Sequence, residues 1–99
     1  KEISSMPSSS RDLSFSIEND KMLGKLIKIV DSFKSPNLKE SFSFDFYINP
    51  KTAIIKIGFR FIFQSSLHSL SDAEIDKEMK LLIDQALEIK GVSIPGILF

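Results

Sequence analysis

Hydrophobic and polar residues alternate most regularly between Ala53 and Gln64. One alternate row is wholly apolar and consists of Ala53, Ile55, Ile57, Phe59, Phe61 and Phe63. The other row contains Lys56 and Arg60. Because successive side chains of a strand point to opposite faces, this pattern predicts a strand with one face in a core and the other in solvent. The two cations then lie about 13 Å apart at about 3.3 Å per residue, a spacing that suits contact with a phosphate backbone.

Two other segments alternate in the same way. Leu13, Phe15 and Ile17 predict a short half-buried strand that begins at Arg11. In the second segment, the residues expected to point inward are Leu38, Glu40, Phe42, Phe44 and Phe46. Those expected to point outward are Lys39, Ser41, Ser43, Asp45 and Tyr47. Asn49 and Pro50 then predict a turn into the long strand, and so an antiparallel hairpin.

Two segments have the period of a helix. The apolar stripe of the first is Leu23, Leu26, Ile27, Val30 and Phe33, with Asn19 or Asp20 as its cap. Ser71 and Glu74 form a capping-box sequence at the start of the second. Its stripe is Ile75, Met79, Leu82, Ile83, Ala86 and Leu87, with Ile89 as an optional last member. Gly91 is expected to end this helix, and Val92 to Ile94 to form a last short strand.

The predicted order is therefore strand, helix, strand, strand, helix, strand. This is the α+β, ferredoxin-like split βαβ arrangement (βαββαβ), a four-stranded antiparallel sheet with two helices on one face. The serine-rich residues 1–10 are expected to be a linker, and residues 11–99 to be the domain. The sheet face without helices is expected to collect the outward polar and charged side chains.

Composition excludes several kinds of chemistry. The 99 residues, 42% of them hydrophobic, suit one domain. The absence of cysteine excludes disulfides, thiol catalysis and cysteine-ligated metals. Thirteen basic and thirteen acidic residues balance, so any affinity for nucleic acid must come from a local patch. No apolar run is long enough to cross a bilayer, so we expect a soluble domain with no membrane partner.

Catalysis within the domain is not indicated. His68 is the only histidine, and no triad spacing surrounds it. Asp72, Glu74, Asp76 and Glu78 look like a cation site, but acids in the first turns of a helix more often complement its dipole. Small acyl-phosphate hydrolases share this topology, yet their phosphate loop is rich in glycine, whereas residues 18–21 are acidic and glycine-free.

Three local patterns occur in order on this topology. Arg11 to Phe15 open the first strand, Phe44 to Tyr47 close the second, and Gln64 to Ile75 lead into the last helix. The chain resembles the ferredoxin-fold anticodon-binding domain found at the C-terminus of phenylalanyl-tRNA synthetase β chains. The resemblance covers about Ile3 to Ile94.

That resemblance implies a domain that is not itself catalytic and that binds the anticodon stem-loop of phenylalanine tRNA. The implied RNA-binding residues are Arg11, Asp12, Ser14, Ser43, Asp45, Tyr47, Lys56 and Arg60. It implies no cofactor or metal in this domain, with ATP and magnesium in the catalytic part of the parent enzyme. The other domains of the β chain and the α chain would be partners, in the cytoplasm or in an organellar matrix.

A second interpretation remains open from the residues alone. The same sheet face suits a ferredoxin-like module that docks onto protein or binds a small metabolite, and a polar outer face is what any two-layer sheet presents. The overall charge of zero is compatible with both interpretations.

Overall fold

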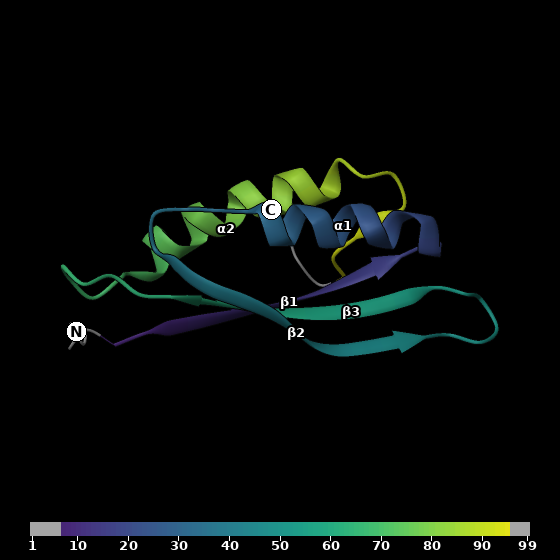
Figure 1. The fold of residues 1–99 in the computed structure, drawn as a ribbon, viewed down its shortest axis with the longest axis horizontal. Helices are drawn as coiled ribbons and strands as arrows, with labels where there is room; N and C mark the ends of the chain where they lie inside the picture. Colours follow the sequence, from purple (N-terminus) through teal and green to yellow (C-terminus); the bar gives the residue numbers. More distant parts are fainter. Residues whose placement is uncertain (1–6, 96–99) are drawn as a thin grey trace.

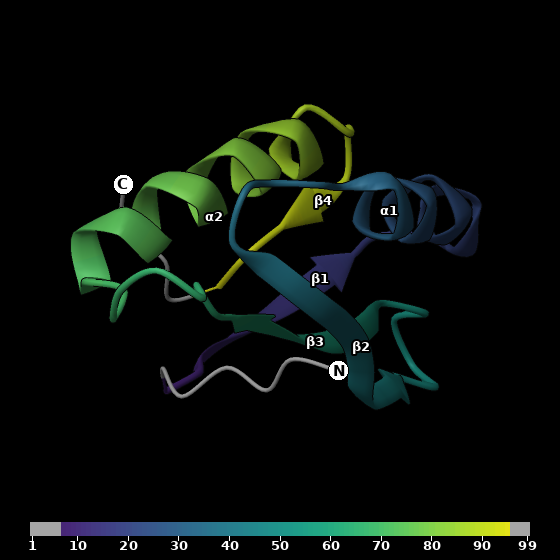
Figure 2. The same cartoon turned by 60° about the vertical axis from the view of Figure 1, so that its left-hand side comes forward.

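Both helices lie on one side of a single antiparallel sheet in the computed structural model, which describes residues 7–95 (Figures 1 and 2). The elements are β1 (Ser9–Ile17), α1 (Asp20–Ser32), β2 (Leu38–Ile48), β3 (Ile55–Phe63), α2 (Asp72–Leu87) and β4 (Val92–Ser93). The strand order is β2-β3-β1-β4. These findings confirm the predicted ferredoxin-like fold. We call the sheet face without helices the open face.

The expected linker lies partly outside the described residues, because residues 1–6 are not among them. Strand β1 begins at Ser9, two residues before Arg11, and Ser9 pairs with Phe63 of β3. The first strand therefore runs the full length of β3, from Ser9 opposite Phe63 to Ile17 opposite Ile55.

The apolar row of β3 forms the centre of the core. Ile55, Ile57, Phe59, Phe61 and Phe63 are all buried, as predicted. Ala53 does not extend this row. Its φ of 63° places it in the left-handed region, in a turn that Asn49 closes by accepting hydrogen bonds from the backbone N–H groups of Lys51 and Thr52.

The helices begin where the sequence predicts. Asn19 caps α1, and Ser71 and Glu74 form both hydrogen bonds of the capping box of α2. Most of the two predicted stripes is buried, but Ile27 and Leu87 are 37% and 46% exposed, so their inclusion was wrong. Helix α2 ends at Leu87 with Glu88 as its C-cap. Gly91, with a φ of 92°, therefore serves the turn into β4 and not the end of the helix.

Strand β2 differs most from the prediction. Two β-bulges interrupt its pairing with β3, one between Leu38 and Glu40 and one between Ser43 and Asp45. Each extra residue reverses which alternate row faces the helices. Between the bulges, Phe42 pairs with Arg60 on the open face, and Ser43 pairs with buried Phe59 on the helix-covered face. The predicted inward positions of Glu40 and Phe42 and outward positions of Ser41 and Ser43 were therefore wrong.

Candidate nucleic-acid interface

Three rows of side chains cross the open face from β1 through β3 to β2. In order along the sheet they are Asp12, Arg60 and Phe42; Ser14, Gly58 and Asp45; and Ser16, Lys56 and Tyr47. Paired residues of neighbouring antiparallel strands share a face. The structure thus brings together most of the predicted site residues, namely Asp12, Ser14, Asp45, Tyr47, Lys56 and Arg60.

Two predicted site residues lie on the helix-covered face instead. Arg11 pairs with Phe61, and its guanidinium lies 2.7 Å from a carboxylate oxygen of Asp72 and 3.9 Å from one of Asp76. Ser43 pairs with Phe59. The expectation that Ser43 lies on the open face was wrong because Ser43 lies between the two bulges of β2, where the alternate rows are exchanged. Arg11 faces the helices because it alternates with Asp12, which occupies the open face.

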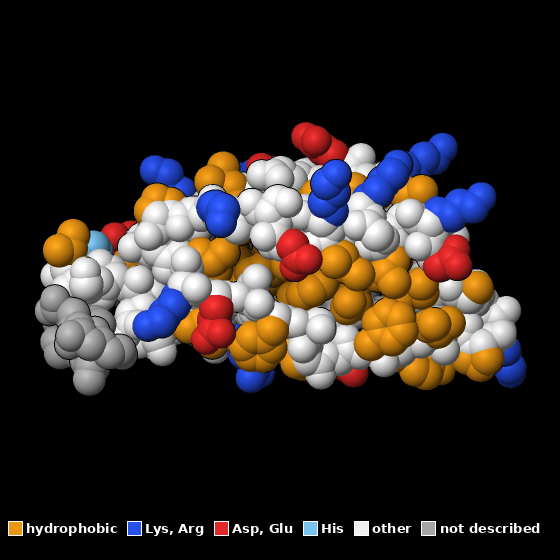
Figure 3. Space-filling model, viewed as in Figure 1, with side chains coloured by type: hydrophobic (Ala, Val, Ile, Leu, Met, Phe, Trp, Pro, Cys, Tyr) orange, Lys and Arg blue, Asp and Glu red, His pale blue; other side chains and the backbone are white. Residues whose placement is uncertain are grey.

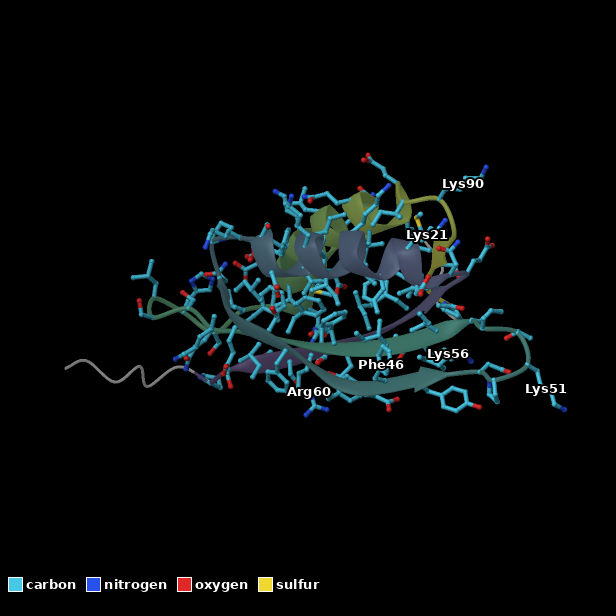
Figure 4. The ribbon with its side chains drawn as sticks, turned by 45° about the vertical axis from the view of Figure 1, so that its right-hand side comes forward. Lys21, Phe46, Lys51, Lys56, Arg60 and Lys90 are labelled. Atoms are coloured by element: carbon cyan, nitrogen blue, oxygen red, sulfur yellow. The ribbon has the colours of Figure 1, made fainter. Side chains whose placement is uncertain are left out.

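Arg60 is not an unpaired cation. Its Nε and Nη2 atoms donate to the two carboxylate oxygens of Asp12 at 2.8 and 2.9 Å. Figure 4 shows Arg60 on the side of the sheet away from the helices. The hydrogen bonds from Arg60, together with its positive charge, hold the pKa of Asp12 below its ordinary value, although partial burial opposes this. The same contacts raise the pKa of Arg60, which stays charged.

This ion pair predicts a pH dependence of stability. The pKa of Asp12 is lower in the folded than in the unfolded protein, so the pair stabilises fully above the unfolded value of about 4. That contribution is lost as the pH falls through the lower folded pKa. In urea unfolding between pH 7 and pH 2.5, Asp12→Asn should therefore flatten the acid limb of the free energy of unfolding. Arg60→Gln should flatten it equally, and wild-type and variant curves that stay parallel would refute the pair's role.

Lys56 and Tyr47 line one hollow at the hairpin end of the open face. This hollow has a volume of about 310 Å³, and its other lining residues are Ser16, Asn49, Thr52 and Ile54. Tyr47 is 54% exposed. Within residues 7–95, the Lys56 ammonium has no ion-pair partner. The hollow therefore offers an aromatic ring, a positive charge and several hydrogen-bonding groups.

Two further aromatic side chains on the open face were missed from the sequence. Phe42 and Phe44 are 42% and 46% exposed, and the Arg60 guanidinium carbon lies 5.2 Å from the centre of the Phe44 ring. Their predicted burial was wrong. The signal available in the sequence was Glu40, because a carboxylate in a supposed core row indicates a shift of register.

The opposite side of β2 is also apolar and exposed. Phe46 pairs with Ile57 and Ile48 with Ile55, so both face the helix side, as predicted for Phe46. They are nevertheless 51% and 50% exposed, because β2 is an edge strand that the helices do not cover. Hydrophobic side chains are visible in this region, between α1 and β2, in Figure 3.

The acids of α2 have structural partners. Asp72 and Asp76 lie by Arg11, and Glu74 accepts from the Ser71 backbone and contacts His68 at 2.9 Å. The Ser71 and His68 hydrogen bonds lower the pKa of Glu74. Glu78, unlike the other three acids, is buried. Within residues 7–95, no three His, Asp or Glu side chains converge as a metal site.

No helix in the described part of the chain is long and apolar enough to span a membrane. This statement covers residues 7–95 alone.

Comparison with known proteins gives the same fold and a family. Residues 4–94 match the family described as ferredoxin-fold anticodon binding domain. The phenylalanine–tRNA ligase β subunit of Francisella tularensis subsp. tularensis is 33% identical over 86 residues, which are 87% of this chain and 10% of that protein. The chloroplastic phenylalanine–tRNA ligase β subunit of Pyropia yezoensis is 36% identical over 75 residues, 74% of this chain and 10% of that protein.

The chain thus spans about a tenth of the length of these relatives. The match to the family extends from before β1 to the end of β4 and includes every element of the sheet. The chain belongs to the ferredoxin-fold anticodon binding domain family.

Proposed function

We propose that this domain binds the anticodon stem-loop of phenylalanine tRNA on the open face of its sheet. The observation that carries the proposal is the exposure of three aromatic rings on that face, Phe42, Phe44 and Tyr47. Unpaired bases of an RNA loop stack on such rings, and neighbouring cations hold the phosphates. The membership of the family and the names of its two relatives support the choice of RNA.

The proposed contacts divide by chemistry. Tyr47 would stack a base in the hollow, Lys56 would hold a phosphate beside it, and Asp45 would accept hydrogen bonds from a base edge. Ser14 would bond to sugar or phosphate. Arg60 and Asp12 would act as a pair, with less net charge than Lys56. Arg11 and Ser43 would make no contact with RNA on the open face, because both lie on the other face.

We further propose that the domain is part of a phenylalanine–tRNA ligase β chain. Two relatives with that name, each about ten times longer than the matched region, support this proposal. ATP and magnesium would then be bound by the catalytic part of the enzyme, outside this chain. The remaining β-chain domains and the α chain would be its protein partners, in the cytoplasm or in an organelle.

Titration of the ¹⁵N-labelled 99-residue chain with the anticodon hairpin of phenylalanine tRNA tests the RNA proposal. We expect chemical-shift changes concentrated in β1, β2 and β3, at residues whose side chains lie on the open face. Binding should weaken as salt rises, because phosphate contacts release counterions. A fully paired RNA duplex of the same length is the control and should bind more weakly, because its bases are not available for stacking.

The competing function gives a different result. Absence of binding at low salt, or shift changes confined to the helices and to the Phe46 side of β2, would contradict the RNA proposal. Either result would favour the interaction or regulatory module.

A further inference from the structure

The Cζ end of the Phe44 ring lies over Gly58. A Cβ atom built on Gly58 would be 2.9, 3.2 and 3.4 Å from Cζ, Cε2 and Cε1 of Phe44. Three similar distances to adjacent ring carbons mean that this Cβ would stand above the ring face, not beyond its edge. Gly58 lies between Ile57 and Phe59, which face the core, so its missing side chain would point to the open face. One face of the ring therefore covers Gly58, and the 46% exposure of Phe44 comes from the remainder.

Neighbouring residues fix the surroundings of this ring. Phe44 is the extra residue of the bulge between Ser43 and Asp45, and the bulge turns its side chain over β3. Arg60 lies two residues along β3 from Gly58, and its guanidinium lies over the Phe44 ring, with its carbon 5.2 Å from the ring centre. Asp12 holds that guanidinium from the other side with two hydrogen bonds. The arrangement is complete before any ligand binds.

We propose that Phe44, seated on Gly58 and flanked by Arg60, is a preassembled stacking site for an unpaired nucleobase, distinct from the Tyr47 hollow. The inference rests on the proposed RNA function and extends it by a second base position. Gly58 and Lys56 are about 6.6 Å apart along β3 at about 3.3 Å per residue, so the two sites receive different bases of one RNA loop. Gly58 is the positioning residue, because a side chain there would displace the ring.

Substitution of Gly58 tests the Phe44 site without changing the other proposed RNA-binding side chains of the open face. In Gly58→Ala the new methyl group would stand 2.9 Å from Cζ of Phe44, which is too close, so the ring must shift. It can do so because Phe44 is an exposed side chain on an edge strand. The fold should persist, since alanine is no worse than glycine in a strand. Phe44→Ala removes the same platform without a change in β3. It keeps the test valid should Gly58→Ala lose its fold.

Two matched controls come from the same chain. Phe46→Ala removes a phenylalanine of similar exposure from the same strand, but from the opposite sheet face. Gly24→Ala adds a methyl group in α1 at a glycine where, apart from its chain neighbours and the backbone of its own helix, no described atom lies within 4 Å of the new Cβ. Thermal melting of each variant establishes that it is folded.

The measurement uses the anticodon hairpin of phenylalanine tRNA with 2-aminopurine placed at each loop position in turn. We expect wild-type protein to quench at least two positions. Phe44→Ala should restore fluorescence at one of them and raise Kd about tenfold, the effect of losing one stacked base. Gly58→Ala, which shifts the ring without removing it, should restore part of the fluorescence at the same position and raise Kd by less than Phe44→Ala. Phe46→Ala and Gly24→Ala should leave Kd within about twofold.

The outcomes distinguish this inference from the proposed function. Wild-type protein that binds no hairpin overturns both. Wild-type binding that depends on Tyr47, with Kd and quenching unchanged in folded Phe44→Ala, overturns the second stacking site and leaves the proposed function intact. Weakening by Phe44→Ala but not by folded Gly58→Ala overturns the positioning role of Gly58.

Discussion

Replacing Tyr47 and Lys56 together by alanine is expected to weaken binding of the phenylalanine tRNA anticodon hairpin about a hundredfold. The two side chains line the same hollow on the open face. Loss of one stacked base costs about 1–3 kcal/mol, and loss of a charge-assisted contact to phosphate adds to it. A hundredfold change in Kd corresponds to about 2.7 kcal/mol. Filter binding or fluorescence anisotropy over a range of salt concentrations measures the effect.

The salt dependence identifies which part of the loss comes from Lys56. Removal of one phosphate contact should lower the slope of log K against log salt by about 0.7, the value for a single strand. Tyr47→Ala alone should leave the slope unchanged. A double variant on other surfaces, Phe46→Ala with Lys28→Ala, removes one ring and one charge as well and serves as the control. Equal losses in the two double variants would refute a specific role for the hollow.

The difference between β3 and β2 explains how much of the fold the sequence predicts. Strand β3 lies between β1 and β2, its pairing with β1 has no bulge, and its inner row is buried along its whole length. The alternation of apolar and polar residues is therefore sufficient to predict which side chains of β3 are buried. Strand β2 is at the edge, where bulges are most common. Its sequence still alternates, but two extra residues invert the middle of the pattern.

The candidate site shows the same limit. Tyr47, Lys56 and Asp45 were predictable because they lie beyond the second bulge or on the regular strand. The pair of Asp12 and Arg60 joins residues 48 positions apart, so it depends on the register of β1 against β3. To predict the contact of Phe44 with Gly58, one must know both the position of the second bulge in β2 and the register of β2 against β3. Alternation assigns a residue to a face, whereas the contacts across that face require knowledge of which residues are paired.

Replacing Glu78 by alanine should lower the free energy of unfolding by about 2–4 kcal/mol. One hydrogen bond to a charged group is worth about 1.5–3 kcal/mol, and the contributions of several bonds to one group do not simply add. Glu78 lies in α2 and is 8% exposed. It accepts hydrogen bonds from the Ser35 hydroxyl at 2.6 Å and from the Asn37 backbone and side-chain amides at 3.0 and 2.6 Å. All three donors belong to the connection from α1 to β2. Urea unfolding at pH 7 measures the change.

The same substitution should also affect β2, which contributes to the open face. The Asn37 carbonyl also accepts from the Gln64 backbone at 2.9 Å, so Glu78 anchors the segment from which β2 begins. We therefore expect faster amide hydrogen exchange in β2 than in β1 of the variant. Glu78→Gln, which keeps one acceptor, should give an intermediate loss. Asp84→Ala, which removes an exposed ion pair with Lys80 on the same helix, should cost only about 0.3–0.5 kcal/mol. Equal losses for Glu78→Ala and Asp84→Ala would contradict the anchoring role of Glu78.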